Sequence, residues 1–168
     1  GLGDVYKRQP YDITAEEVMA FRPDGLFLSN GPGDPSTCTE IISQVRKLYE
    51  SDLPIFAICL GHQLMALANG AKTYKLTYGH RGGNHPVKDL TDGKVYISSQ
   101  NHGYAVDAGS MEQGIAEELF VNVNDGTNEG LRYKGKKIMT VQFHPEANPG
   151  PQDTAWPVSY THLRAHET

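Results

Sequence analysis

The sequence predicts an α/β domain in which helices cover both faces of a parallel sheet. Segments with helical periodicity alternate with short apolar segments through the first half of the chain. The apolar segments lack polar alternation, which is typical of strands that are buried on both faces. With 168 residues, the chain is long enough for one domain with a sizeable core.

Three helices are expected in the first half. The capping box Thr14-Ala15-Glu16-Glu17 predicts a helix that extends to about residue 22. Apolar residues at helical spacing predict a second helix over residues 39–50. A third helix begins near Gly61 and ends before Gly70, which is well placed as a C-terminal cap.

Short apolar strands separate these helices. Leu26-Phe27-Leu28 predicts a buried strand that ends in a loop rich in glycine and proline at residues 30–35, and residues 54–58 predict a second strand. The second half of the chain predicts further strands between turns. These are expected at residues 94–98, 119–123, 131–134 and 138–143.

Composition excludes several classes of protein. The chain has 15 Lys and Arg against 20 Asp and Glu, and its net charge of −5 argues against a surface for nucleic-acid phosphates. The longest apolar segment, Leu53 to Leu60, is much shorter than the roughly 20 residues of a membrane helix. Two cysteines do not make a disulfide framework. We therefore expect a reduced, cytoplasmic protein that binds neither nucleic acid nor membrane.

Cys59 is the strongest candidate for a reactive residue. Ala57 and Gly61 flank it, and a sharp turn from strand to helix requires such small residues. A turn of this kind places the thiol at a helix N-terminus, which favours the thiolate, and leaves the backbone N–H of Leu60 free for an oxyanion. Cys59 as a buried small hydrophobic residue is the alternative, and the spacing alone does not decide between them.

A candidate base lies in His144-Pro145-Glu146, directly after the last predicted strand. A histidine can accept the thiol proton, and a carboxylate can hold the imidazole in the required tautomer. Cys59 and His144 are distant in the sequence, so only the fold could bring them together. Taken alone, His144 is more often an ordinary histidine in a turn at the end of a strand.

Other polar segments are less informative. The glycines of residues 30–35 would let a ligand approach the backbone, but a plain surface turn has the same composition. The polar segment at residues 99–104 is expected to be a loop. His80 and His85 have a separation that suits a metal site, but no cysteine or acidic cluster joins them in the sequence, so we expect no metal.

Together these residues resemble the class I, or triad-type, glutamine amidotransferases. Cys59-Leu60-Gly61 and His144-Pro145-Glu146 are similar to the nucleophile turn and the triad of that superfamily. Residues 79–87 and 99–107 are similar to the glutaminase domain of carbamoyl phosphate synthetase small subunits in particular. The resemblance covers residues 10–154 and implies a three-layer fold with a mixed, mostly parallel sheet and helices on both faces.

The resemblance implies that the chain hydrolyses glutamine. Cys59 would attack the side-chain amide, His144 would carry the proton from the thiol to the departing ammonia, and Glu146 would orient His144. The backbone N–H groups of Gly31 and Leu60 would form the oxyanion hole. The other residues implied to line the glutamine site are Gly33, Gln63, Asn101, Gly103 and Tyr104.

The resemblance also implies a partner. The ammonia would pass to a carbamoyl phosphate synthetase large subunit, which uses ATP, Mg²⁺ and bicarbonate to make carbamoyl phosphate for arginine and pyrimidine synthesis. The sequence contains no phosphate-binding motif of the G-x-x-x-x-G-K-[ST] type, so no cofactor is expected on this chain. The alternatives are a stand-alone cysteine hydrolase, a glutaminase subunit of another synthetase, and an inactive fragment that only binds the large subunit.

Three features depart from the family pattern. Ala57 stands where the family usually has glycine, and it would cost about 1 kcal/mol if the turn required a positive φ there. Residues 1–9 and 156–168 do not resemble the family. We interpret both as non-native extensions of a domain, residues 10–155, that is truncated at both ends; divergent natural termini are the alternative.

Overall fold

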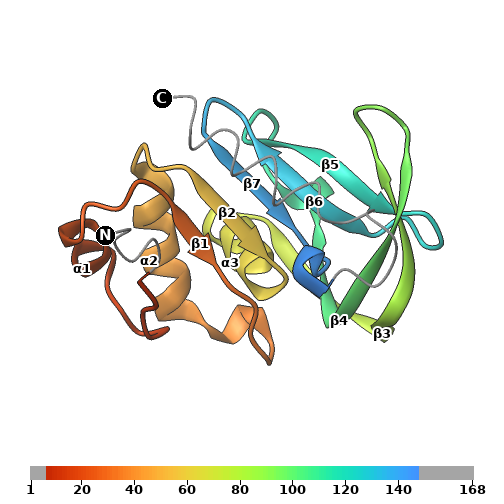
Figure 1. Cartoon of the computed structure of the whole chain (residues 1–168), viewed down its shortest axis with the longest axis horizontal. Coiled ribbons are helices and arrows are strands. Elements are labelled where there is room, and N and C mark those ends of the chain that lie inside the picture. The colour runs from red at the N-terminus through yellow and green to blue at the C-terminus, as the bar shows by residue number, and fades with distance from the viewer. Residues whose placement is uncertain (1–6, 148–168) are drawn as a thin grey trace, which may run out of the picture.

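A computed structural model describes residues 7–147 of the chain. One curved sheet crosses the described part, and its strands follow the order β1-β2-β7-β6-β5-β3-β4 (Figure 1). The extension predicted at residues 156–168, and most of that at 1–9, lie outside the described residues. Within residues 7–147, no helix is long and apolar enough to cross a membrane.

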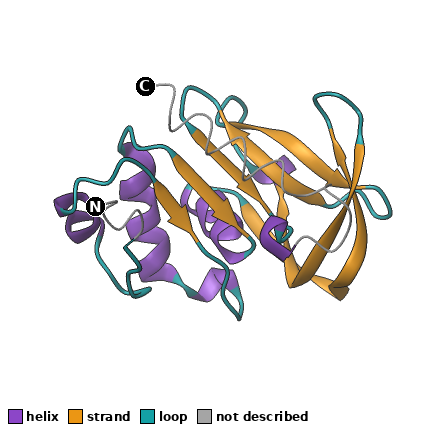
Figure 2. Ribbon diagram, in the orientation of Figure 1, coloured by secondary structure: helices purple, strands orange, loops and turns teal. Residues whose placement is uncertain are grey.

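The α-helices are α1 (Ala15–Ala20), α2 (Thr39–Glu50) and α3 (Leu60–Ala68). The strands are β1 (Leu26–Leu28), β2 (Ile55–Ile58), β3 (Lys72–Asp89), β4 (Val95–Asp107), β5 (Ala116–Asn122), β6 (Asn128–Tyr133) and β7 (Ile138–Val141). Short 3₁₀ turns occur at Pro35–Thr37, Ala108–Ser110 and Pro145–Ala147. Figure 2 shows the three α-helices gathered around the parallel strands, whereas the antiparallel strands extend away from them.

All three predicted helices are confirmed. At α1, Thr14 Oγ1 accepts a hydrogen bond from the backbone N–H of Glu17 at 3.2 Å, and the Thr14 N–H donates to Glu17 Oε2 at 2.8 Å. These two bonds are the capping box. Helix α2 begins and ends at the predicted residues. Gly70 follows α3 with a φ of +84°, in the left-handed region that favours glycine.

The parallel part of the sheet consists of β1, β2 and β7, with β2 between the other two. Every residue of β2 and β7 is buried, in agreement with their sequences, which are apolar except for Thr140. The strand predicted at Leu26-Phe27-Leu28 is confirmed as β1, but the prediction that it is buried is wrong. Strand β1 pairs only with β2 in the described structure. Leu26 and Leu28 pack against the apolar cluster on the helix side, whereas Phe27 alternates to the other face of this edge strand and is 57% exposed.

The strands predicted in the second half all fall on observed strands, but β3 was not predicted and β4 is much longer than expected. Strands β3 and β4 form a long hairpin, and β4 includes residues 99–104, which were expected to be a loop. The pairing of the hairpin is interrupted by register shifts near His80 and His85, and these irregularities disrupt regular alternation. The expectation of a mixed sheet is confirmed, but in the described part only the β1–β2 and β2–β7 pairings are parallel, so the sheet is mostly antiparallel rather than mostly parallel.

The two faces of the sheet bury separate apolar clusters. Helices α1, α2 and α3 all contribute to one cluster, through residues such as Val18, Leu48 and Met65. The cluster on the other face includes Phe120 and Phe143, and none of its described members comes from a helix. The described helices therefore cover one face of the sheet rather than both.

Candidate active site

Cys59 occupies the sharp turn between β2 and α3 that the sequence predicts. Its φ of +50° is uncommon for a residue with a side chain, and such strain is typical of functional sites. The Cys59 N–H donates to Val141 O of β7 at 2.9 Å, and its carbonyl accepts from the Gln63 N–H at 3.2 Å. A Cβ at Gly61 would lie 2.5 Å from Leu28 O, so only glycine allows α3 to approach β1.

Ala57 carries no backbone strain. It lies inside β2, where it pairs with Leu28 on one side and Thr140 on the other. The positive φ of this turn belongs to Cys59 itself, and Ala57 is not among the described non-glycine residues with positive φ. The departure from the family pattern at position 57 therefore does not disturb the turn.

The environment of the Cys59 thiol opposes its ionisation. Burial raises the thiol pKa from 9.0 to about 11, and the negative charges of Glu146 and Glu129 act in the same direction. Hydrogen bonds from the Leu60 backbone and the Gln142 side chain lower the pKa but do not offset burial. The N-terminus of α3 was expected to favour the thiolate, yet the resting thiol is protonated at neutral pH. Its activation therefore requires a base.

His144 and Glu146 form a pair directly after β7. Glu146 Oε1 lies 2.9 Å from His144 Nδ1, which identifies Nδ1 as the protonated nitrogen and places the lone pair of the neutral ring on Nε2. The His144 backbone N–H donates to Ser99 O at 2.8 Å and ties this turn to β4. The His144 side chain is 12% exposed, whereas that of Glu146 is 52% exposed. The pair thus has the arrangement of a base and its orienting carboxylate.

One cavity of about 660 Å³ brings the predicted residues together. Cys59, His144 and Glu146 all line it. The predicted glutamine-binding residues that line the same cavity are Gly31, Gly33, Gln63, Asn101, Gly103 and Tyr104. Leu60 is the one predicted residue that is not part of the lining, but its side chain packs on the Gly31 loop. A Cβ at Gly31 would lie 2.7 Å from Leu60 Cδ2.

Several lining residues were not singled out from the sequence. They are Asn30, Pro32, Arg81, Ser99, His102 and Ala147. Most are immediate neighbours of predicted site residues, whereas Arg81 comes from β3. Its place in residues 79–87, one of the two segments that carry the resemblance to small subunits, was the available signal.

Two buried amides support the pocket from the side of β7. Gln63 Nε2 donates to Tyr104 O at 2.8 Å and to Gln142 Oε1 at 2.9 Å. Gln142 is fully buried, and its Nε2 has no nitrogen or oxygen partner among the described residues. The contact of this side chain with Cys59 lowers the thiol pKa. Gln63 therefore holds Gln142 in an orientation that offers a donor to the sulfur.

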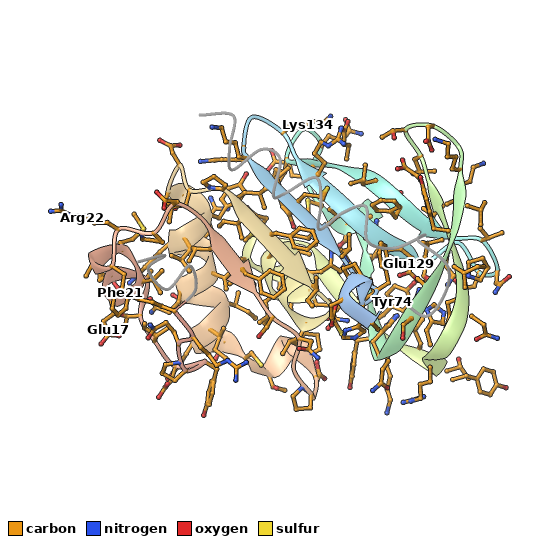
Figure 3. The ribbon with its side chains drawn as sticks, in the orientation of Figure 1. Glu17, Phe21, Arg22, Tyr74, Glu129 and Lys134 are labelled. Carbon is orange, nitrogen blue, oxygen red and sulfur yellow. The ribbon has the colours of Figure 1, made fainter. Side chains whose placement is uncertain are left out.

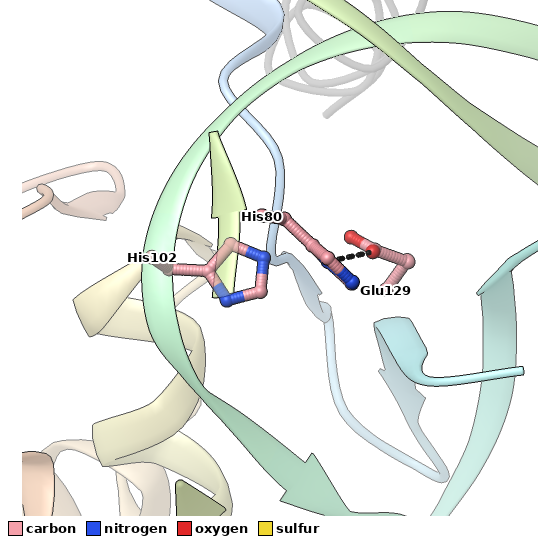
Figure 4. Close-up of side chains that lie close together, drawn as sticks. All are labelled: His80, His102 and Glu129. Carbon is pink, nitrogen blue, oxygen red and sulfur yellow. Dashed lines mark ion pairs between the residues drawn. The ribbon is translucent and has the colours of Figure 1, made fainter. Parts of the chain in front are cut away.

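A buried polar cluster adjoins the cavity and consists of His80 from β3, His102 from β4 and Glu129 from β6 (Figure 4). His80 Nδ1 lies 3.4 Å from Glu129 Oε1. The hydrogen bonds to Glu129 and Asp125 raise the pKa of His80 to about 9. Burial lowers the pKa of His102 to about 4. Because His102 also lines the cavity, this histidine–glutamate cluster is continuous with the pocket wall.

Comparison with known proteins identifies similar sequences and folds. The protein-family model described as Glutamine amidotransferase class-I matches residues 4–159. The carbamoyl phosphate synthase small chain of Brucella anthropi is 56% identical over 155 residues, which are 92% of this chain and 38% of that protein. The small chain of Rhizobium meliloti is 56% identical over 146 residues, or 86% and 36% of the respective chains. The chain thus spans little more than a third of the length of these relatives.

Solved structures with the same fold share less sequence. A putative GMP synthase protein from Thermoplasma acidophilum has a TM-score of 0.70 and 21% identity, and the match covers 94% of this chain and 83% of that one. A glutamine amidotransferase from Thermotoga maritima has a TM-score of 0.61 and 22% identity, with coverage of 88% and 64%. At these identities the likeness shows the fold alone.

Proposed function

The chain belongs to the class I glutamine amidotransferase family, and from this we propose that it hydrolyses glutamine to glutamate and ammonia through Cys59, His144 and Glu146. The observation that carries the proposal is the shared cavity. It is lined by a cysteine in a strained turn after β2 and by a histidine–carboxylate pair after β7. Neither element is informative alone, but together they supply a nucleophile, a base and an orienting group.

The reaction would begin with proton transfer. Because the pKa of the resting thiol is about 11, His144 Nε2 must accept the proton as the sulfur attacks the amide carbon of glutamine. The new C–S bond gives a tetrahedral intermediate whose oxyanion would accept hydrogen bonds from the N–H groups of Gly31 and Leu60. Packing of the Leu60 side chain on Gly31 supports this role, since it keeps the two backbones close.

The second half of the cycle would release both products. The His144 imidazolium donates its proton to the amide nitrogen, the C–N bond breaks, and ammonia leaves a glutamyl thioester on Cys59. Water then attacks the thioester carbonyl while His144 again accepts a proton. Collapse of this second intermediate breaks the C–S bond and releases glutamate, and His144 returns its proton to the Cys59 sulfur. Glu146 serves throughout by fixing the Nδ1 proton of His144.

Glutamine would be held by groups on α3, β4 and the loop at residues 30–35. We assign this role to Gly33, Gln63, Asn101, Gly103 and Tyr104, because all of them line the cavity beside Cys59. Asn101 and Gly103 lie on one strand, β4, whose backbone at Tyr104 is bonded to Gln63. A site on a strand and a helix is better defined than one on loops alone.

The relatives suggest what becomes of the ammonia. Both are carbamoyl phosphate synthase small chains, and we extend the proposal to a partner large subunit that receives the ammonia. That subunit would use ATP, Mg²⁺ and bicarbonate to make carbamoyl phosphate for arginine and pyrimidine synthesis in the cytoplasm. The proposed glutaminase step itself uses only side chains and water, so it requires no cofactor on this chain.

The first experiment is covalent labelling with an electrophilic glutamine analogue, read by intact mass. One adduct on the wild-type chain, absent from a Cys59→Ala control, is the expected result. Absence of an adduct from folded protein would contradict the glutaminase proposal and favour an inactive fragment that only binds a large subunit. Release of glutamate, followed with and without a purified carbamoyl phosphate synthetase large subunit, then tests the partner. Stimulation by an unrelated synthetase instead would identify another amidotransferase.

A further inference from the structure

We propose that the histidine–glutamate cluster of His80, His102 and Glu129 binds a divalent transition metal ion, with Zn²⁺ as the best match. All three side chains are buried, and their possible ligand atoms lie within 4.8 Å of one another (Figure 4). Figure 3 shows Glu129 among the strands, whereas Arg22 points away from the protein. The cluster shares no residue with the triad, although His102 lines the same cavity.

The outer nitrogens of both histidines are held by oxygen acceptors. His80 Nε2 lies 2.8 Å from Asp125 Oδ2, and His102 Nδ1 lies 2.8 Å from Tyr104 O. Because these oxygens only accept hydrogen bonds, each of these nitrogens carries a proton. The lone pair of each neutral ring is then on the inner nitrogen. Histidine ligands in metal sites show this pattern, in which a carboxylate or carbonyl binds the second nitrogen.

The inner nitrogens face oxygens rather than donors. Gln100 Oε1 lies 3.0 Å from His80 Nδ1 and 2.8 Å from His102 Nε2, and Glu129 Oε1 lies 3.4 Å from His80 Nδ1. Two ring nitrogens and two oxygens therefore converge. With a pKa of about 9, His80 carries a proton on Nδ1 at neutral pH, and without that proton all four atoms could donate electron pairs. A cation placed among them, either a proton or a metal ion, would remove their mutual repulsion.

The orientation of Gln100 is fixed by its other contacts. Gln100 Nε2 donates to Ser98 Oγ at 3.0 Å, and the Ser98 hydroxyl donates to His85 O at 2.8 Å. Reversing the amide would place its oxygen against a hydroxyl oxygen whose proton is already used. Rotation of Gln100 would therefore turn an amide donor toward the cluster only at the cost of its hydrogen bond to Ser98.

Unpaired polar atoms provide a second, independent observation. Glu129 has no exposed surface, and its Oε2 has no hydrogen-bond partner among the described residues, although Oε1 accepts from Asn122 Nδ2 at 3.2 Å. His85 Nε2 is likewise buried without a described partner, and the His85 ring centroid lies 5.1 Å from that of His80. A buried carboxylate with a free oxygen favours a nearby cation.

The donor set matches zinc chemistry. Two imidazole nitrogens and one carboxylate oxygen form a known three-ligand zinc set, and Gln100 Oε1, His85 or water is available for a fourth position. Ligand atoms around tetrahedral zinc are about 3.3 Å apart, so the widest separation here would contract by roughly 1.5 Å. The expectation of no metal rested on the absence of an acidic residue near His80 and His85. The fold supplies that residue from β6.

The test uses the full chain with both thiols removed, as Cys38→Ser and Cys59→Ala, so that sulfur cannot bind the ion. Co²⁺ is titrated into this chain and followed by visible absorption and by calorimetry. We expect about one Co²⁺ ion to bind per chain, in a tetrahedral site of nitrogen and oxygen ligands, and Zn²⁺ to displace the bound Co²⁺. Adding Glu129→Gln or His80→Asn should weaken binding at least about tenfold. The matched control Glu118→Gln changes an exposed carboxylate on β5 and should bind as the parent does.

Two results would overturn the proposal. If the folded parent gives no cobalt spectrum, the cation that the cluster holds is a proton. Equal affinity in the parent and in folded Glu129→Gln and His80→Asn would place the ion elsewhere, with His144 the first alternative. Far-UV circular dichroism verifies that each variant is folded. The titration of the parent does not depend on the folding of any cluster variant. Because the parent lacks Cys59, either result is independent of glutaminase activity.

Discussion

Burial and the negative charges of two glutamates raise the pKa of the Cys59 thiol, whereas hydrogen bonds from Leu60 and Gln142 lower it. We expect the rate of Cys59 alkylation by iodoacetamide to rise with pH toward a midpoint near 11. The folded chain holds the thiol proton more tightly than the unfolded chain. The contribution of the protonated thiol to the free energy of unfolding is therefore complete below pH 9.0 and is lost as the pH rises toward about 11. Mass spectrometry of a variant that lacks Cys38 gives the rate of Cys59 alkylation. A midpoint of the alkylation profile below pH 9 would instead show that His144 already holds the thiol proton at rest.

Gln142 is expected to stabilise the developing thiolate. Gln142→Leu removes a buried donor, so the thiol pKa should rise further and kcat/KM for glutamine should fall about 10- to 100-fold. Glutamate release and the pH profile of alkylation measure the two effects. Gln113→Leu, at an exposed position, is the matched control. An unchanged alkylation profile in folded Gln142→Leu would assign Gln142 a purely structural role.

Glu146 is expected to act through His144 rather than on the substrate. Glu146→Gln keeps the shape of the side chain but no longer holds the imidazole in one tautomer, so kcat should fall by about two orders of magnitude with little change in KM. Steady-state glutamate release gives both constants. A large rise in KM with unchanged kcat would mean that Glu146 contacts glutamine instead.

The site residues differ in how far local sequence reveals them. Cys59 and His144 were predicted because each ends a recognisable strand in a motif with a chemical purpose. Gln142 and Glu129 carry no such signal, since a polar residue inside an apolar strand has no assigned partner until the strands pair. Their importance depends on contacts with Gln63 and His80, which are distant in the sequence.

Among the secondary-structure elements, the turn from β2 to α3 depends most on side-chain size. A Cβ at Gly61 would collide with the backbone of β1, so Gly61→Ala should destabilise the fold by about 1–3 kcal/mol. Ala57→Gly is the matched comparison, because it introduces glycine into a buried strand without strain and should cost only about 0.5–1 kcal/mol. Urea denaturation measures both. Higher activity in Ala57→Gly would show that position 57 limits the turn.

Helices and parallel strands were predictable because their signals are local. Capping at Thr14, the helical spacing of α2 and the apolar sequence of β2 each need only a few neighbouring residues. The β3–β4 hairpin is different, because polar and glycine-rich stretches are stabilised by cross-strand pairing with two register shifts. Pairing of this kind depends on residues far along the chain, and local periodicity does not report it.

Across the entire domain, one sheet separates two apolar clusters that share β2 and β7. We therefore expect a single unfolding transition. Leu131→Ala on one face and Phe120→Ala on the other should each lower stability by about 2–5 kcal/mol, and both should shift the same transition. Urea titrations followed by circular dichroism and by Cys59 reactivity check this. Transitions that separate between the two probes would show that the faces unfold independently.

The backbone N–H of Cys59 donates a hydrogen bond to the carbonyl oxygen of Val141, at the end of the strand that precedes His144. The nucleophile therefore lies one strand away from the segment that carries the base. Neighbouring strands are about 4.8 Å apart in any sheet, so this spacing is a property of the backbone and not of the surrounding side chains. Insertions in the surface loops would leave this spacing between the strands unchanged. The entrance of the pocket could therefore be remodelled extensively while the backbones of Cys59 and Val141 keep the spacing that the sheet sets.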